Sequence, residues 1–410
     1  MFRLNLSSRV VAVSSLALLA SCETTKRDVL GPSTPAGGDM FQSYVALGNS
    51  ITAGYQSGGI NDSTQRQSYA RWLAQAMGTQ YHYASLNMPG CPPPIANTQT
   101  GARVAGGAST TCAFRASASV TDILNNVAVP GARVLDPVSS STVASNALTT
   151  FVLGGKSQVQ RALDAKPTFV SAWIGNNDVL EAGLSGVLVP TPNVSPGIVS
   201  TLAQFTASYD AMIKQLTDSM PSVKGLLIGV VQVSGVPQLS SGALIAASPT
   251  IQAGISQAAG TPVIVHPNCT ASASLVNVVL LIPAIKAKTH PALIGCDKGT
   301  IPGTPVGDVF VLDAAEQQTL GATIQSYNDY IKGKAQALGW AYYDPNVLLA
   351  AKRASGDIPP FPNLASPTAT FGPFLSLDGV HPSAAAHLSL ANDMIVAINA
   401  KFGTKLPAVP

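Results

Sequence analysis

An aspartate and a histidine stand three residues apart near the end of the chain, in Leu377-Asp378-Gly379-Val380-His381-Pro382. This spacing lets the Asp378 carboxylate orient the His381 ring and stabilise its protonated form. A histidine supported in this way can take a proton from a nucleophilic hydroxyl. The other four histidines have no acidic partner at comparable spacing, so His381 is the candidate base; they are His82, His266, His290 and His387.

A serine follows the first apolar run, in Gly48-Asn49-Ser50. The run over residues 40–47 predicts a strand, and Gly48 permits a tight turn after it. Ser50 would then lie at the carboxyl end of a strand, where α/β enzymes bind their ligands. Thr52 stands where a G-x-S-x-G turn requires its second glycine, so a different arrangement of the nucleophile is expected. Ser50, His381 and Asp378 can fill the roles of nucleophile, base and orienting acid.

Strands and helices alternate along the chain. Apolar runs predict strands over residues 40–47, 81–86, 168–174, 224–233 and 340–343. Helical spacing and capping residues predict helices over residues 65–77, 157–165, 198–220, 313–338 and 383–402, with Gly78 and Gly403 as C-terminal caps. This alternation predicts an α/β fold with a mostly parallel sheet covered on both faces. Ser50, Gly90, Asn177 and the loop before the last helix should then meet at one sheet edge.

The α/β pattern is interrupted but not divided. No internal repeat and no linker between two cores is present, so we expect one domain over residues 40–403, followed by a tail over 404–410. Residues 91–150 and 235–307 depart from the alternation and are predicted to be loop-rich insertions. The apolar run over residues 275–285 is too short to cross a bilayer, and we expect a buried helix or strand there.

The N-terminus has the layout of an export signal. Two arginines precede an apolar segment, and small residues lead to Leu19-Ala20-Ser21-Cys22. We expect residues 1–21 to be a signal peptide and Cys22 to become a lipidated first residue; simple cleavage nearby is the alternative. Residues 22–39 then predict a flexible tether. Because Glu23 and not an aspartate follows the cysteine, the outer membrane is the favoured destination in a diderm cell.

The charge composition argues against a nucleic-acid-binding protein. Charged residues make up 10% of the 410-residue chain, well below the usual ~25%. The net charge of +3 falls to +1 without Arg3 and Arg9 of the signal segment. This balance does not support nucleic-acid binding.

Four cysteines remain after Cys22: Cys91, Cys112, Cys269 and Cys296. An even number in an exported chain predicts two disulfides. Of the three possible pairings, Cys91 with Cys112 and Cys269 with Cys296 closes the shorter loops. A zinc site is the alternative, but neither a C-x-x-C motif nor a nearby histidine pair supports it. We expect no metal and no organic cofactor.

Four blocks, in order, resemble those of the SGNH hydrolases, the GDSL lipase and esterase family. They are Gly48-Asn49-Ser50-Ile51, Asn87-Met88-Pro89-Gly90, Gly175-Asn176-Asn177-Asp178 and Asp378-Gly379-Val380-His381. The resemblance implies the three-layer SGNH fold with a flavodoxin-like central sheet. It also implies that Ser50 is the nucleophile, that Asp378 and His381 complete the triad, and that Gly90 and Asn177 join the Ser50 amide in the oxyanion hole. Asn49 and Ile51 stand where the family name has aspartate and leucine.

The resemblance implies a lipase-like or esterase-like hydrolase that cleaves carboxylic esters of lipids or acylated glycans. The alternatives are a carbohydrate O-acetylesterase, an acyltransferase with the same triad, and a binding lipoprotein of the same fold without catalysis. Fold and triad do not fix the substrate. We expect the insertion over residues 235–307 to be either an apolar wall for a lipophilic acyl chain or a packed excursion; its apolar residues include Leu239, Leu244, Ile245, Ile251, Ile255 and Leu275.

Overall fold

The computed structural model describes residues 38–114, 123–139, 147–188, 198–297 and 310–410. They belong to one compact unit of the chain, which begins at Pro35. The expected signal peptide lies outside the described residues, as does the expected tether up to residue 37. Within the described ranges, no helix combines the length and the apolar character needed to cross a membrane.

A four-stranded parallel sheet forms the centre of the fold, in the order β1-β2-β3-β9. Strands β1 and β2 pair in register, so that Gly48 lies opposite Trp173 at their carboxyl ends. The predicted α/β fold with a parallel sheet is confirmed. The strands span Tyr44–Gly48 (β1), Phe169–Trp173 (β2), Lys224–Ile228 (β3) and Ala341–Tyr343 (β9).

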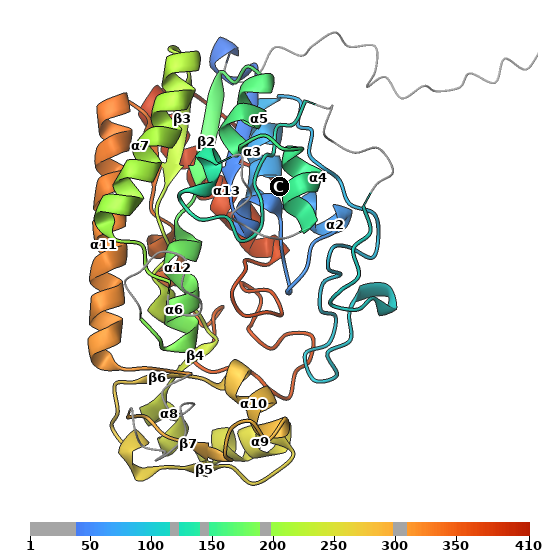
Figure 1. Ribbon diagram of the computed structural model, residues 1–410, viewed down its shortest axis with the longest axis vertical. Coiled ribbons are helices and arrows are strands. Elements are labelled where there is room, and N and C mark those ends of the chain that lie inside the picture. The colour runs from blue at the N-terminus through green and yellow to red at the C-terminus, as the bar shows by residue number, and fades with distance from the viewer. Residues whose placement is uncertain (1–37, 115–122, 140–146, 189–197, 298–309) are drawn as a thin grey trace, which may run out of the picture. The chain divides into compact units, whose positions relative to one another are not determined.

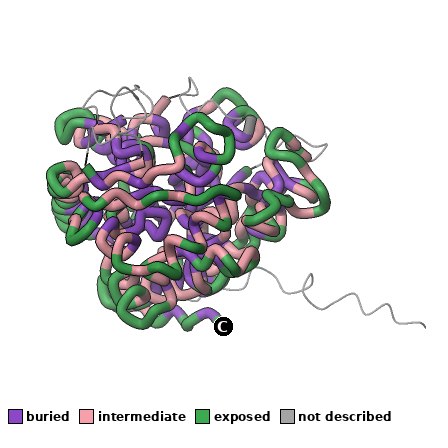
Figure 2. Tube along the Cα trace, turned by 90° about the horizontal axis from the view of Figure 1, so that it is seen from below, coloured by how far each residue is buried: buried purple, intermediate pink, exposed green. Residues whose placement is uncertain are grey.

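Helices cover both faces of this sheet because successive strand residues point to opposite sides. Val45 and Leu47 pack into a core with α5 (Gln158–Asp164), α7 (Leu202–Ser219) and α11 (Ala314–Leu338). Tyr44 and Ala46 pack on the other face with α3 (Tyr69–Met77) and α13 (Ala384–Phe402). Figure 1 shows α7 and α11 side by side, and Figure 2 shows the buried residues gathered inside a rim of exposed loops.

Shorter elements connect these layers. The remaining helices are α1 (Ser50–Ala53), α2 (Asp62–Gln65), α4 (Ala147–Leu153), α6 (Leu180–Ser185), α8 (Gly242–Ala247), α9 (Pro249–Ala259), α10 (Val278–Lys286) and α12 (Pro345–Ala354). The remaining strands are β4 (Leu239–Ser241), β5 (Ile264–Val265), β6 (Leu275–Asn277), β7 (Leu293–Ile294) and β8 (Val311–Leu312). Turns of 3-10 helix are η1 (Gly38–Phe41), η2 (Val104–Gly106), η4 (Asp136–Val138), η5 (Asn176–Asp178), η6 (Val233–Gly235) and η7 (Pro267–Cys269).

The expected strand over residues 81–86 does not form. Only Tyr83 makes a bridge there, and it pairs with Asn126. Side chains satisfy the neighbouring backbone instead: Gln65 accepts from the Leu86 amide at 3.0 Å and donates to the Ala84 carbonyl at 2.9 Å. Sheet-like pairing with β1 comes from residues 125–129, whose Val127 and Val129 amides donate to carbonyls of β1.

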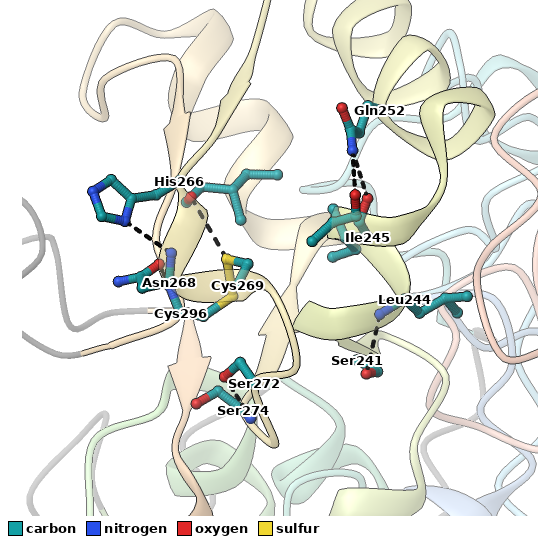
Figure 3. The surroundings of a disulfide bond; sticks show 12 residues. Ser241, Leu244, Ile245, Gln252, His266, Asn268, Cys269, Ser272, Ser274 and Cys296 are labelled. Carbon is teal, nitrogen blue, oxygen red and sulfur yellow. Dashed lines mark hydrogen bonds between the residues drawn. A yellow bond between two sulfur atoms is a disulfide. The ribbon is translucent and has the colours of Figure 1, made fainter.

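The described part of the second insertion, residues 235–297, has an apolar core of its own. Its strands β4 and β6 form a small antiparallel sheet with β8, which follows the insertion, and α9 contacts both α8 and α10. The apolar run over residues 275–285 contributes β6 and most of α10, as a buried segment of the insertion. Cys269 and Cys296 form a disulfide, beside which the Cys296 amide donates to Asn268 Oδ1 at 3.1 Å (Figure 3).

The first insertion is also closed by a disulfide, between Cys91 and Cys112. The local pairing of the four cysteines is therefore the one present. Among the described residues, no group of three or more histidine, cysteine, aspartate or glutamate side chains could hold a metal ion.

His387 is a fully buried histidine between α13 and α3. Its Nδ1 accepts the Tyr69 amide at 3.2 Å, so the ring proton of the neutral form is on Nε2. Burial, with a smaller contribution from the nearby charge of His381, lowers the pKa of His387 to about 3. The folded protein therefore keeps this ring neutral under conditions in which the unfolded chain protonates it.

This difference predicts a loss of stability in acid. Between the unfolded pKa of ~6.5 and the folded value, the unfolded state binds the extra proton, so the free energy of unfolding falls as pH falls. From pH 7 to pH 4 the loss through His387 should be ~3 kcal/mol. His387→Asn keeps an acceptor for the Tyr69 amide and cannot titrate, so it should lose less. Urea unfolding at several pH values tests this, and equal pH slopes for the two proteins would contradict it.

Candidate active site

Ser50 is the first residue of α1, directly after β1. Gly48 ends the strand where a Cβ would lie 2.7 Å from the Trp173 carbonyl oxygen, so only glycine fits. Asn49 caps α1 by accepting the Ile51 amide at 3.1 Å, which fixes the turn that carries Ser50. The local sequence therefore presents the Ser50 hydroxyl at the carboxyl edge of the sheet.

Ser50, His381 and Asp378 form a continuous hydrogen-bonded chain. Ser50 Oγ lies 2.8 Å from His381 Nε2, and His381 Nδ1 lies 2.8 Å from Asp378 Oδ2. The ionised carboxylate accepts a hydrogen bond from the protonated Nδ1, which leaves Nε2 free of a proton and able to accept from the serine hydroxyl. The three residues expected from the sequence are thus brought together with the geometry of a nucleophile, a base and an orienting acid.

The Asp378 carboxylate is well supplied with donors. It accepts the backbone amides of Val380 at 2.9 Å, His381 at 2.8 Å and Gly58 at 2.6 Å. Burial of the 13%-exposed side chain opposes ionisation. The charge of His381, with the hydrogen bonds from its ring and from the His381 and Val380 amides, outweighs burial and lowers the pKa of Asp378 to about 2. Asp378 is therefore an anion across the physiological range.

The loop that carries Asp378 and His381 does not follow a strand, contrary to the expectation. Strand β9 is followed by α12 and then by an irregular segment. The loop is held by contacts with residues 57 and 58: the Ser57 amide donates to Ser376 Oγ at 2.8 Å, and the Leu377 amide donates to Ser57 Oγ at 3.1 Å. Pairing between these two loops, not the end of a strand, brings the imidazole to Ser50.

Tyr55 packs on the imidazole from the same side of the chain as Ser50. Its ring centroid lies 4.9 Å from that of His381. Burial and the nearby charge of Asp378 raise the pKa of Tyr55 to about 12, so its hydroxyl is neutral. This contact could not be predicted from the sequence, because Tyr55 follows Ser50 on a turn and has no recognisable spacing to His381.

Asn177 follows β2 in the turn η5 and lies beside the segment that carries Gly131. Its side-chain amide donates to the Ala132 carbonyl at 2.9 Å, which uses one of its two hydrogens. The next residue, Asp178, accepts the Val134 amide at 2.9 Å and the Ser200 hydroxyl at 2.6 Å. Burial raises the pKa of Asp178 to about 6 in spite of these bonds. Asp178 thereby fixes the Asn177 turn against residues 131–134.

A cavity of about 470 Å³ opens at these residues, and Gly131 contributes to its wall while Gly90 does not. Gly90 is buried, whereas its neighbours Cys91 and Pro92 line the cavity. Gly131 is an exposed glycine with φ of +84°, at the end of the segment that pairs with β1. The signal for it was the apolar run before Pro130-Gly131, which resembles the run before Gly48. The wall is formed by Ser50, Tyr55, Cys91, Pro92, Ser109, Thr110, Thr111, Cys112, Pro130, Gly131, Leu148, Asn177, Leu180 and His381.

Comparison with known proteins gives one family. Residues 44–394 match the family model described as GDSL-like Lipase/Acylhydrolase. No curated protein sequence matches the chain.

Solved structures resemble the chain distantly. A mutant of an acetyl-xylooligosaccharide esterase from Geobacillus stearothermophilus is 13% identical, with 89% of this chain and 96% of that chain covered and a TM-score of 0.35. A carbohydrate esterase family 2 enzyme from Corynascus thermopiles (Myceliophthora fergusii) is 15% identical, with 91% and 69% covered and a TM-score of 0.38. An extracellular lipase from Streptomyces rimosus is 13% identical, with 88% and 99% covered and a TM-score of 0.34. These likenesses do not bear on the substrate.

The hydrogen-bonded chain predicts a strong dependence of Ser50 reactivity on Asp378. Asp378→Asn places an amide against the His381 ring and favours the tautomer that cannot accept the serine proton. The rate at which a fluorophosphonate probe labels Ser50 should fall ~10³-fold or more. Asp357→Asn, at a partly exposed ion pair with Lys352, is the matched control and should label at the normal rate. A labelling rate within ~10-fold of the unmodified protein, in a folded Asp378→Asn variant, would contradict the assignment.

Proposed function

The chain belongs to the GDSL-like lipase/acylhydrolase family, and from that premise we propose that it hydrolyses carboxylic esters through a covalent ester on Ser50. The observation that carries this proposal is the chain of hydrogen bonds from Ser50 through His381 to Asp378. The family makes the protein an ester-hydrolysing enzyme; the assignment of these residues is ours.

In the first half of the reaction, Ser50 Oγ attacks the carbonyl carbon of the ester while His381 Nε2 takes the hydroxyl proton. The tetrahedral intermediate collapses when His381 returns this proton to the departing alcohol, which leaves an acyl group on Ser50. In the second half, His381 takes a proton from water, and the hydroxide formed attacks the acyl carbon. The carboxylic acid leaves and Ser50 regains its proton. Asp378 keeps the ring oriented in both halves and stabilises the imidazolium.

The developing negative charge on the carbonyl oxygen needs donors. We assign these to the amides of Ser50 and Gly131 and to the side chain of Asn177. The assignment of Gly131 in place of Gly90 is supported by its position in the cavity wall and by the bond from Asn177 to the adjacent Ala132. Donors fixed in this way are worth ~3–4 kcal/mol each in related chemistry.

Substitutions of Ser50 and Asn177 should have different effects, because one removes the nucleophile and the other removes an oxyanion donor. Ser50→Ala should abolish hydrolysis of p-nitrophenyl acetate, because no acyl-enzyme can form. Asn177→Ala should lower kcat ~10²–10³-fold and still react with the fluorophosphonate probe. Ser389→Ala, on the exposed side of α13, is the control and should keep full activity. Undiminished hydrolysis by purified Ser50→Ala protein would disprove the mechanism.

We further propose that the protein is exported and held to the outer membrane through a lipidated Cys22. Support comes from the Leu19-Ala20-Ser21-Cys22 motif after a basic and apolar segment and from Glu23 after the cysteine. The two disulfides are compatible with an oxidising compartment.

Cys22→Ser should therefore release the protein. The unmodified chain, expressed in a diderm bacterium, should incorporate labelled palmitate and sediment with outer-membrane vesicles, whereas Cys22→Ser should do neither. Thr25→Ala, in the same segment, should behave like the unmodified chain. Absence of label from the unmodified chain would rule out the lipid anchor, whatever its activity.

A further inference from the structure

Two cavities of very different size meet at the proposed nucleophile. The large one, of about 470 Å³, is described above. The small one has a volume of about 40 Å³ and is lined by Asn49, Ser50, Ile51, Asn176, Asn177, Leu180, Val231, Val233, Val236, Val380 and His381. Ser50, Asn177, Leu180 and His381 belong to both walls. The space around a group bound at Ser50 is therefore wide on one side and narrow on the other.

The narrow cavity, here called the valine slot, is mostly apolar. Val231, Val233 and Val236 enter it from the segment after β3, and Val380 enters it from the loop between Asp378 and His381. Its polar lining residues are Asn49, Ser50, Asn176, Asn177 and His381. A mostly apolar cavity with a reactive serine in its wall suits a short hydrocarbon group attached to a carbonyl.

The slot has stiff walls. The Val231 amide donates to Asn176 Oδ1 at 3.0 Å, which joins this wall to the turn of Asn177. Val233 and Val236 are buried, and Gly183 packs so closely on Val233 that a Cβ would lie 2.4 Å from its Cγ1. Valine side chains have few rotamers, so the slot cannot widen by a simple side-chain rotation.

An ester has an acyl half and an alcohol half, and the slot can hold whichever of them is short. With about 40 Å³ of space against about 470 Å³ in the wide cavity, the slot has room for a short group only. The wide cavity presents hydroxyl-bearing residues, Ser109, Thr110 and Thr111, together with the Tyr55 ring, and accepts a much larger group.

We propose that the valine slot binds the acyl half and limits the enzyme to esters of acetate and similarly short acids, with the alcohol in the wide cavity. This inference rests on the proposed function and names its substrate class. It disfavours the expected apolar wall for a long acyl chain, because the six apolar residues expected to form that wall do not line either cavity at Ser50. Five of these residues pack within the insertion's own core or against the main core: Leu239, Ile245, Ile251, Ile255 and Leu275.

The depth of the slot is set by one layer of side chains. A second apolar cavity of about 40 Å³ lies next to it, and both are lined by Ile51, Val231, Val236 and Val380. Shortening Val236 should join the two spaces. Val236 is separate from the triad and the oxyanion donors, so its substitution changes the room for the acyl group and leaves the reacting groups in place.

The test measures kcat/KM for p-nitrophenyl acetate, butyrate and octanoate and for methyl octanoate. The unmodified enzyme should prefer acetate, with a loss of ~10-fold or more for each methylene beyond the slot. Val236→Ala should raise the butyrate-to-acetate ratio about 10-fold, and Val236→Ile should lower it. Val396→Ala, an exposed residue of α13, is the matched control and should not change the ratio.

The outcomes separate the slot from the mechanism. Octanoate hydrolysed as well as acetate, or methyl octanoate as the best substrate, would overturn the assignment of the acyl half to the slot. An unchanged ratio in folded Val236→Ala and Val236→Ile proteins that still label with fluorophosphonate would also overturn it. If the unmodified enzyme does not react with the fluorophosphonate probe, the proposed function itself is disproved.

Discussion

The buried carboxylate of Asp378 is the charge around which the site is built. An anion removed from water is stable only when donors surround it. Here the donors come from two loops that are more than three hundred residues apart, at Gly58 and at residues 380–381. The same bonds that keep Asp378 ionised therefore dock the histidine loop against the chain that follows Ser50. The ionisation of Asp378 and the position of His381 therefore depend on the same set of hydrogen bonds.

Side-chain amides form hydrogen bonds with the backbone at the carboxyl edge of the sheet. Gln158 accepts the Gly48 amide and donates to the Gly48 carbonyl, both at 3.0 Å, where β1 ends. Asn125 and Asn126 donate to carbonyls of Tyr44 and Thr52. Buried backbone groups must find partners, and these side-chain amides supply partners for backbone groups where the chain leaves regular structure close to Ser50. Irregular backbone at the site is thus stabilised by residues that do no chemistry.

The sequence was sufficient where the signal was local. Apolar periodicity, with Gly78 and Gly403 as C-terminal caps, predicted the main helices, and small polar residues after two strands indicated Ser50 and Asn177. It was insufficient where the partner is distant. Residues 81–86 form no strand, and the Gln65 side chain satisfies part of their backbone instead. Gly131 reaches the site because residues 125–129 pair with β1. The periodicity of the sequence shows neither contact, and the short apolar run before Pro130-Gly131 is the one local signal for Gly131.

The bond between Cys91 and Cys112 forms part of the wall of the wide cavity. A disulfide is made only where an oxidant is present, so this part of the wall is covalently closed only in an oxidising environment. In a reducing environment Cys91 and Cys112 would be free thiols, and the wall of the wide cavity would lack this cross-link.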